Sequence, residues 1–380
     1  MTEGALRLLE IYPNTDFFTG AAVQFSELVT GLAARGHAVV VLTGPSAIWR
    51  EKMRARGVTH HALPMPPSVN LRSVMALVRM IRRHRFHVVR AHKGVARTHV
   101  LLAGLLTRVP ALVLNRGVSF RLDPLNRLGY TTRRVTAVVA VCESIKRGLM
   151  AQGVPEKKVE VIYSGTDTDR FHPRVDGGAV RRELGLGPEH FLFTQIGVRS
   201  SKGNDVVIDA FARVAPQCPR ARLLIVGARN AAPLHERAQA RGVREAVEIW
   251  GYREDVPQIL RATDCSVDAS WSGLGLTGSV RESLAVGTAV IATDLEGNPE
   301  LVRHGETGLL VPARDPAALA HAMETVLGDP ALVARTGEAG RRRVERDFSL
   351  RVKLDRTEAL YRRLATRAPR SSPCAESLAS

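Results

Sequence analysis

Short apolar runs alternate with helical patterns along most of the 380 residues. In the first half, apolar runs typical of buried parallel strands predict strands at 6–12, 37–43, 58–63, 86–92, 111–116, 137–142 and 159–163. Apolar residues at helical spacing predict helices between them, at 21–36, 46–56, 71–84, 95–106 and directly after 142. Strand–helix alternation of this kind predicts a doubly wound parallel sheet.

The same alternation restarts in the second half. Residues 164–190, rich in Gly, Asp, Pro and Arg, are interpreted as a connector. Strands are then expected at 191–197, 222–228, 247–251, 265–270, 288–293 and 308–312, and helices at 203–215, 233–241, 254–262, 278–286 and 315–327. We therefore expect an α/β protein with two facing Rossmann-like domains, 1–168 and 186–348, and a disordered Pro/Ser-rich tail, 366–380.

Composition narrows the class of protein. No run approaches the ~18 apolar residues that a membrane-spanning helix needs, and no basic start precedes an apolar block, so a cytoplasmic protein is expected. The four cysteines form no CxxC pair and the twelve histidines no HExxH motif. We expect neither a disulfide framework nor an essential metal.

The positive charge is concentrated in the first half. Residues 1–170 carry 25 Lys/Arg and 11 Asp/Glu, a net charge of +14, whereas 171–380 carry +3. This asymmetry favours an anionic partner: a nucleic acid, an acidic membrane surface or a phosphorylated acceptor. Aromatic residues make up only 5% of the chain, which argues against nucleic acid. Segment 71–85 is either a core-facing helix with a solvated basic face or a membrane-surface helix.

In doubly wound sheets, ligands bind beyond the carboxyl ends of the strands. The small residues 275–279 open a predicted helix, where backbone N–H groups can approach a diphosphate, and Glu282 lies one turn inside. Arg199 and Lys202 follow a predicted strand and can neutralise a leaving diphosphate. Taken singly, a Gly-rich helix start is more often only a turn, and the pair of cations is equally typical of a solvated surface.

Three further strand ends carry candidate residues. Amides of the loop 293–302 and Glu300 are placed to hold a sugar or phosphate. His92 ends a predicted strand, and Gly20 precedes the first helix. Their plain structural interpretations are a helix cap, a hydrogen-bonded core histidine and a simple turn. Their joint placement at the strand ends of two facing sheets favours a binding cleft.

From 6 to 365 the chain resembles the retaining GT-B glycosyltransferases of group 1, or family 4. The resemblance is carried by "TGAAVQFSELVTGLAARGHAVVVLT", "VEVIYSGTDTDRF", "IGVRSSKGNDVVIDAF" with "ARLLIVG", and above all "GLTGSVRESLAVGTAVIATDLEGNPELVRHGETGLLV". It implies transfer of a sugar from a nucleotide diphosphate donor with retained anomeric configuration. It also implies that a terminal helix, 350–365, crosses back to the first domain.

The resemblance implies a role for each candidate. The catalytic set comprises Arg199 and Lys202, at the donor diphosphate, and His92, near the donor sugar. Glu282 matches the second Glu of the family's Glu-x7-Glu motif, which holds the donor ribose. The other expected donor-binding residues are Gly20, Arg253, Gly275, Leu276, Thr277, Gly278, Gly297, Asn298, Pro299 and Glu300, with Tyr252 and Arg253 as base neighbours.

Two departures from the family pattern leave alternatives open. Leu274 stands where the first Glu of that motif contacts the transferred sugar, and Ala21 replaces a usual Gly. A non-catalytic relative of the fold is therefore an alternative. An NAD oxidoreductase is disfavoured because "IYPNTDFFTGAAVQ" lacks GxGxxG. The acceptor is expected to be an anionic lipid-linked molecule or saccharide of lipopolysaccharide or cell-surface polysaccharide assembly, met by Arg121, Arg127, Arg133 and Arg134 at the inner face of the membrane.

Overall fold

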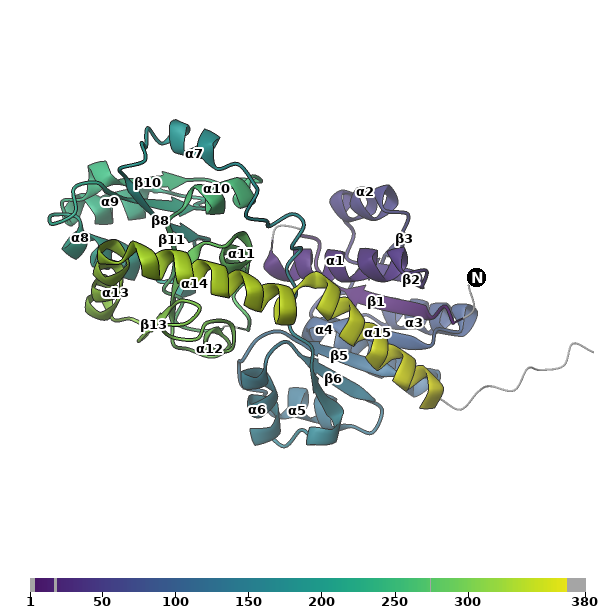
Figure 1. Ribbon diagram of the computed structural model, residues 1–380. Coiled ribbons are helices and arrows are strands. Elements are labelled where there is room, and N and C mark those ends of the chain that lie inside the picture. The colour runs from purple at the N-terminus through teal and green to yellow at the C-terminus, as the bar shows by residue number, and fades with distance from the viewer. Residues whose placement is uncertain (1–3, 17–18, 274, 368–380) are drawn as a thin grey trace, which may run out of the picture.

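A computed structural model describes residues 4–16, 19–273 and 275–367. They form two lobes, each built on a parallel sheet (Figure 1). The first sheet has the order β3-β2-β1-β4-β5-β6-β7. Its strands are β1 (Arg7–Tyr12), β2 (Ala38–Thr43), β3 (Thr59–Ala62), β4 (Val88–His92), β5 (Leu112–Arg116), β6 (Ala137–Ala140) and β7 (Val159–Val161).

The second sheet repeats this topology in the order β10-β9-β8-β11-β12-β13. Its strands are β8 (Phe191–Ile196), β9 (Ala221–Val226), β10 (Val247–Trp250), β11 (Cys265–Asp268), β12 (Ala289–Thr293) and β13 (Leu309–Val311). In both sheets the strand order reverses beside the first strand, which is the switch point of a doubly wound fold. The predicted fold class, two Rossmann-like domains, is confirmed.

Helices cover both sheets. The first lobe contains α1 (Gly20–Ala34), α2 (Ala47–Ala55), α3 (Leu71–His84), α4 (Lys93–Leu106), α5 (Pro124–Thr131) and α6 (Glu143–Ala151). The second contains α7 (Gly178–Glu183), α8 (Asn204–Val214), α9 (Ala232–Ala240), α10 (Val256–Ala262), α11 (Gly278–Val286), α12 (Asn298–Leu301), α13 (Pro316–Gly328) and α14 (Pro330–Arg343). The last helix, α15 (Leu350–Arg367), returns to the first lobe (Figure 1).

Three helices were not predicted from the sequence. Helix α7 lies inside the segment interpreted as a connector, and it is only six residues long. Helices α5 and α14 both begin with Asp-Pro. In each, the Asp carboxylate caps a first-turn amide and the Pro takes the position whose N–H needs no partner. That start signal was present in the sequence, but the apolar pattern behind it is weak.

The basic helix α3 faces the core. Val74, Leu77, Val78 and Ile81 are buried in it, so the core-facing interpretation of this segment is confirmed. Leu71, also part of the predicted apolar stripe, is 68% exposed at the start of the helix. No helix of the described residues is long and apolar enough to span a bilayer.

The chain crosses between the lobes twice, and the two crossings are joined. The amide of Thr166 donates to the carbonyl of Phe348 at 2.9 Å, and the amide of Leu350 donates to the carbonyl of Thr166 at 2.8 Å. From there α15 packs on α1 and buries Leu354 and Tyr361 in the first lobe. Of the predicted disordered tail, residues 366 and 367 belong to α15, and 368–380 lie outside the described residues.

Candidate functional site

The carboxyl ends of the two sheets face each other, and their loops touch. The Ser119 hydroxyl, beyond β5, donates to Glu296 Oε1 beyond β12 at 2.7 Å. The Gly275 backbone packs so closely on Gly117 that a Cβ added to Gly275 would lie 2.7 Å from the Gly117 carbonyl oxygen. Gly275 and the loop that contains Glu296 therefore lie at the junction of the two lobes, against residues 117–119.

Lys202 is buried, and its charge is balanced inside the second lobe. Its Nζ lies 2.5 Å from Asp268 Oδ2 at the end of β11 and 3.2 Å from the Ser279 hydroxyl in the first turn of α11. Burial alone would raise the pKa of Asp268, but the Lys202 charge and hydrogen bond lower it below its usual value. The ion pair therefore holds a cation beside the start of α11. The sequence analysis included Ser279 in the predicted helix start 275–279 but missed Asp268, for which a carboxylate at the end of an apolar strand was the available signal.

Arg199 lies on the exposed side of the same loop. It adopts extended backbone before the short turn Ser200–Lys202. Its side chain forms no ion pair or hydrogen bond with the part of the chain that the structure describes. Lys202 is thus fixed by the fold, whereas the guanidinium of Arg199 is available to a ligand.

The start of α11 has no side-chain cap. Thr277 precedes the helix, but its hydroxyl donates to Asn298 Oδ1 at 2.8 Å and does not cap the first-turn amides. Uncapped N–H groups at a helix start and the helix dipole both favour an anion. Leu276 and Thr277 are buried, so their side chains support the loop. Leu274, the predicted departure from the family motif, lies outside the described residues.

Glu282 lies one turn further along α11 and is partly exposed. A Cβ added to Gly278 would lie 3.8 Å from Glu282 Oε1, so the carboxylate folds back over the helix start. Burial raises the pKa of Glu282 to about 7; Arg281 opposes this rise and Glu27 adds to it. A carboxyl group in this position changes its charge near neutral pH.

The loop 297–300 is held by the packing of its own residues. Gly297 contacts the Gly275 backbone, and a Cβ there would lie 2.2 Å from the Gly275 carbonyl oxygen. Asn298 is fully buried and donates to the carbonyl of Thr293 at 3.1 Å, while Pro299 is exposed. Gly297 and Asn298 therefore fix the loop, and Pro299 presents its ring to solvent.

Glu300 points to the first lobe. Its carboxylate accepts the amides of Glu143 and Ser144, each at 2.8 Å, at the start of α6. Burial and the nearby Glu300 carboxylate raise the pKa of Tyr163 to about 12. Glu300 thus joins the two lobes as a helix cap, a contact that the sequence did not suggest.

His92 is buried under the cleft. Its Nε2 lies 2.9 Å from Glu10 Oε2, and the Tyr361 hydroxyl donates to Glu10 Oε1 at 2.5 Å. Burial lowers the pKa of His92 to about 4, although the hydrogen bond to Glu10 opposes this shift. His92 is therefore a neutral imidazole at physiological pH, with one ring nitrogen already bonded.

Gly20 and Arg253 lie at the edges of the candidate site. Gly20 begins α1, and a Cβ added to it would meet no atom within 4 Å. Arg253 lies over the Trp250 ring at 4.4 Å and pairs with Glu183 at 2.8 Å and Asp255 at 2.7 Å. Since two carboxylates already balance it, Arg253 offers little net charge to a ligand.

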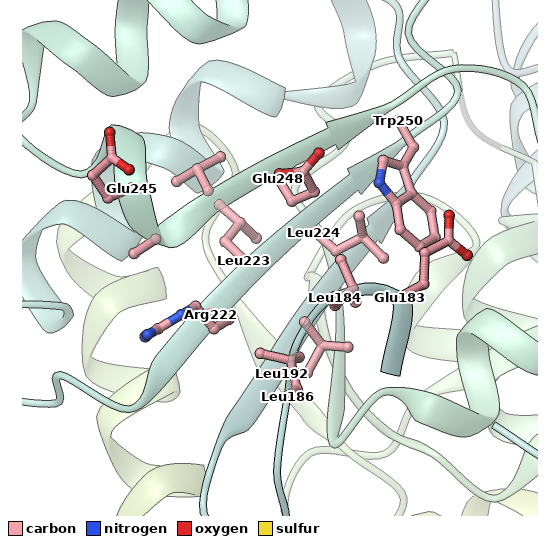
Figure 2. Close-up of a pocket in the computed structure, with 12 residues that line it drawn as sticks. Glu183, Leu184, Leu186, Leu192, Arg222, Leu223, Leu224, Glu245, Glu248 and Trp250 are labelled. Atoms are coloured by element: carbon pink, nitrogen blue, oxygen red, sulfur yellow. The ribbon is translucent and has the colours of Figure 1, made fainter. Parts of the chain in front are cut away.

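A separate cavity of about 340 Å³ lies on the sheet of the second lobe, with Leu224 and Trp250 among its walls (Figure 2). It lies between α7 and β10 and contains none of the predicted site residues. The candidate site is therefore the junction of the lobes.

Comparisons with known proteins identify the family. Residues 18–170 match the model "Glycosyltransferase Family 4" and residues 190–329 match "Glycosyl transferases group 1". The chain is 28% identical to the lipopolysaccharide core biosynthesis mannosyltransferase LpsB of Rhizobium meliloti, over 78% of this chain and 85% of the relative. It is 23% identical to the Escherichia coli UDP-Gal:alpha-D-GlcNAc-diphosphoundecaprenol alpha-1,3-galactosyltransferase, over 77% and 79%.

A solved structure agrees over nearly the whole fold. Anabaena Alr3699/HepE, crystallised with UDP, matches with a TM-score of 0.84 at 20% identity, covering 93% of this chain and 99% of the other. Family matches in both lobes and a shared two-domain fold lead to one conclusion. The chain belongs to the group 1 glycosyltransferases with the GT-B fold.

Proposed function

We propose that the protein is a retaining glycosyltransferase of cell-envelope glycan assembly, which moves a sugar from a nucleotide diphosphate donor to an anionic lipid-linked or saccharide acceptor. The observation that carries the proposal is the buried Lys202, held 2.5 Å from Asp268 beside the uncapped start of α11. Asp268 balances the Lys202 charge but fixes its Nζ at the helix start, where this donor and the free helix-start amides are suited to hydrogen-bond a diphosphate leaving group.

The donor would lie across the open face of the second lobe. Lys202, Arg199 and the amides of α11 would neutralise the charge that develops on the departing diphosphate. Glu282 would accept the ribose hydroxyls. With the phosphates at the start of α11, the ribose, the next part of the nucleotide, would lie beside the carboxylate one turn along the helix. In this arrangement protein cations perform the electrostatic work, and no essential metal is required.

The sugar end of the site is formed by backbone. The backbone of loop 297–299 would hold the transferred sugar, with the Gly297 N–H as its amide donor, because Pro299 has no N–H and the Asn298 N–H donates to the carbonyl of Leu295 at 3.1 Å. Asn298 fixes this loop. His92 is neutral and its Nε2 is bound to Glu10, so its Nδ1 is the ring nitrogen left for a sugar hydroxyl. With no protein nucleophile assigned, we propose that the acceptor attacks on the face that the diphosphate leaves, which retains the anomeric configuration.

The acceptor would bind the first lobe, which carries most of the positive charge. Two relatives support this acceptor class by their names: one acts in lipopolysaccharide core biosynthesis, the other on a diphosphoundecaprenol-linked sugar. The exposed Leu71 and Met75 on the basic helix α3 offer a peripheral contact with an acidic membrane. We propose a cytoplasmic protein that meets the inner face of the plasma membrane there.

Thermal shift with UDP-, GDP- and ADP-sugars tests the proposal. We expect one nucleotide class to stabilise the protein and Lys202→Ala to abolish that shift, with Arg54→Ala, on the exposed face of α2, as control. No stabilisation by any nucleotide sugar would overturn the transferase function. Donor binding without sugar transfer to lipid-glycan extracts would favour the non-catalytic relative. The anomeric configuration of the product, read by NMR, tests retention.

A further inference from the structure

Three cations gather at the carboxyl ends of two neighbouring strands in the first lobe. Lys93 directly follows β4, and Arg116 ends β5. The register pairs His92 with Asn115, so the backbones of Lys93 and Arg116 run side by side. Arg97 lies one turn into α4, and a Cβ added to Gly94 would lie 3.7 Å from its Nη2. The Arg97 guanidinium therefore reaches back to the helix start.

Arg97 and Arg116 share an aromatic neighbour. The Arg97 guanidinium lies 5.0 Å from the centre of the Tyr130 ring, and the Arg116 guanidinium lies 5.9 Å from it. Arg97 is only 6% exposed and donates to Asn126 Oδ1, while Arg116 donates to the carbonyl of Phe120. Both side chains are thus oriented by neutral partners, which leave their charges unbalanced.

No carboxylate in the described residues forms an ion pair with Lys93, Arg97 or Arg116. The acid connected to Arg97 through hydrogen bonds is Asp123. It accepts from Asn126, which in turn accepts from Arg97, so Asn126 lies between the carboxylate and the guanidinium. Arg97 is buried, Arg116 is partly exposed and Lys93 is exposed, and burying a cation such as Arg97 is costly unless an anion accompanies it. An anionic group of a ligand would supply that counter-charge.

The backbone at this point is also typical of a ligand site. Lys93 has a φ of 69°, in the left-handed region that non-glycine residues rarely adopt outside constrained sites. His92 precedes α4 without a side-chain cap, because its ring is bound to Glu10. The first-turn amides of this helix of 14 residues are therefore free of a side-chain cap at the point that the Arg97 guanidinium reaches, with the backbone of Lys93 in the same turn.

The cluster lies beside the junction of the lobes. Directly after Arg116, Gly117 packs on Gly275 and Ser119 bonds to Glu296 of the donor loop. Phe120, next in the chain, is 61% exposed. An anion bound by the cluster would thus stand within reach of a sugar held by loop 297–299, with apolar surface alongside.

We infer that Lys93, Arg97 and Arg116 form a binding site for a phosphate ester of the acceptor. The inference rests on the proposed function, because it places the acceptor on the first lobe. The phosphate oxygens accept from the two guanidinium groups and the α4 amides, while Lys93 closes the site from the side of β1, where its Nζ lies 5.0 Å from the Tyr12 ring. The site positions the acceptor and takes no part in bond making.

Calorimetric titration of inorganic phosphate in the presence of saturating UDP tests this site. We expect Lys93→Gln/Arg116→Gln to weaken phosphate binding at least tenfold. The matched pair Arg54→Gln/Arg56→Gln, which removes the same charge from the end of α2 and the residue after it, should change binding less than twofold. Equal losses in both pairs, or none in either, would overturn the site. If the double variant does not fold by circular dichroism, the exposed Lys93→Gln alone should lose at least threefold.

Two further titrations distinguish a soluble phosphate ester from a lipid phosphate. They are read together with UDP binding, which tests the proposed function separately. Glucose 6-phosphate presents a soluble ester, and phosphatidylcholine vesicles with phosphatidic acid present one on an apolar chain. Selective weakening of either by Lys93→Gln/Arg116→Gln identifies the source, and weakening of neither refutes the inference. UDP binding should be unchanged in both pairs. If UDP fails to bind the unmodified protein, the proposed function fails while the phosphate titration still decides the site.

Discussion

Replacing Lys202 with methionine should destabilise the protein and should do so in a pH-dependent way. The side chain is 6% exposed, and its Nζ lies 2.5 Å from the carboxylate of Asp268, which is 2% exposed. Methionine fills most of the volume but leaves a buried carboxylate without its counter-charge. Breaking a buried pair in this way costs about 3–5 kcal/mol. We expect Lys202→Met to lower the free energy of unfolding by that amount at pH 8.

The direction of the pH dependence follows from Asp268. In the unmodified protein Lys202 outweighs burial and holds the pKa of Asp268 below its usual value. The ion pair therefore stabilises the fold above that usual value and is lost as the pH falls through the lowered pKa. In Lys202→Met the hydrogen bonds from Ser270 and Ser279 remain, but the largest influence that opposes burial is gone, so the pKa of Asp268 rises. The folded variant then takes up a proton that the unfolded chain does not, and the deficit shrinks toward pH 5.

Urea denaturation at pH 8, 6.5 and 5 measures this deficit. A deficit of the same size at all three values would refute the account of Asp268. Lys202→Met/Asp268→Asn provides the control, because it removes both charges and should recover most of the stability. UDP affinity should stay low in the double variant. Recovery of UDP affinity together with stability would show that Lys202 is only structural.

Three other predictions concern Glu282, Glu300 and the glycines of the site. UDP should bind at least threefold more tightly at pH 8 than at pH 6, since Glu282 loses its proton near pH 7 and accepts stronger bonds when charged; calorimetry should find a smaller change in Glu282→Gln. Glu300→Ala should cost about 1 kcal/mol in urea denaturation by uncapping α6, and an unchanged midpoint would argue against that contact. Gly297→Ala should cost about 1–3 kcal/mol by overpacking, whereas Gly20→Ala, with open space around it, should be near neutral in the same assay.

The order of strands and helices could be predicted because both sheets are buried on two faces. Strands buried on both faces appear in the sequence as continuous apolar runs. The predicted bounds of β1, β4, β8 and β11 therefore lie within two residues of those in the structure. The same reasoning placed His92 and Lys202 at strand ends, where doubly wound folds bind ligands. It did not find α5, because a helix of eight residues is too short for an apolar repeat to be recognised in the sequence.

Side-chain partners could not be predicted, because they come from different strand ends. Lys202 meets Asp268, 66 positions later, only because β8 and β11 are neighbours in the sheet. Glu300 was placed near the transferred sugar, and its neighbour Asn298 does fix that loop. Its carboxylate nevertheless caps α6 of the other lobe, 157 positions away. A contact between two domains produces no periodic pattern in the sequence of either domain, so it could not be predicted.

The distribution of charge could also be predicted only in part from the sequence. The sequence assigns a net charge of +14 to the first half. A count of residues does not show which arginines lack an acidic partner, because every arginine contributes the same charge to the sum. In the second lobe Arg237 and Arg241 share Asp209. In the first lobe Arg97 and Arg116 face Tyr130 and neutral oxygens, without an acid among the described residues. The excess charge is therefore fixed in part beside the cleft, and fixed unbalanced cations are what an anionic acceptor needs.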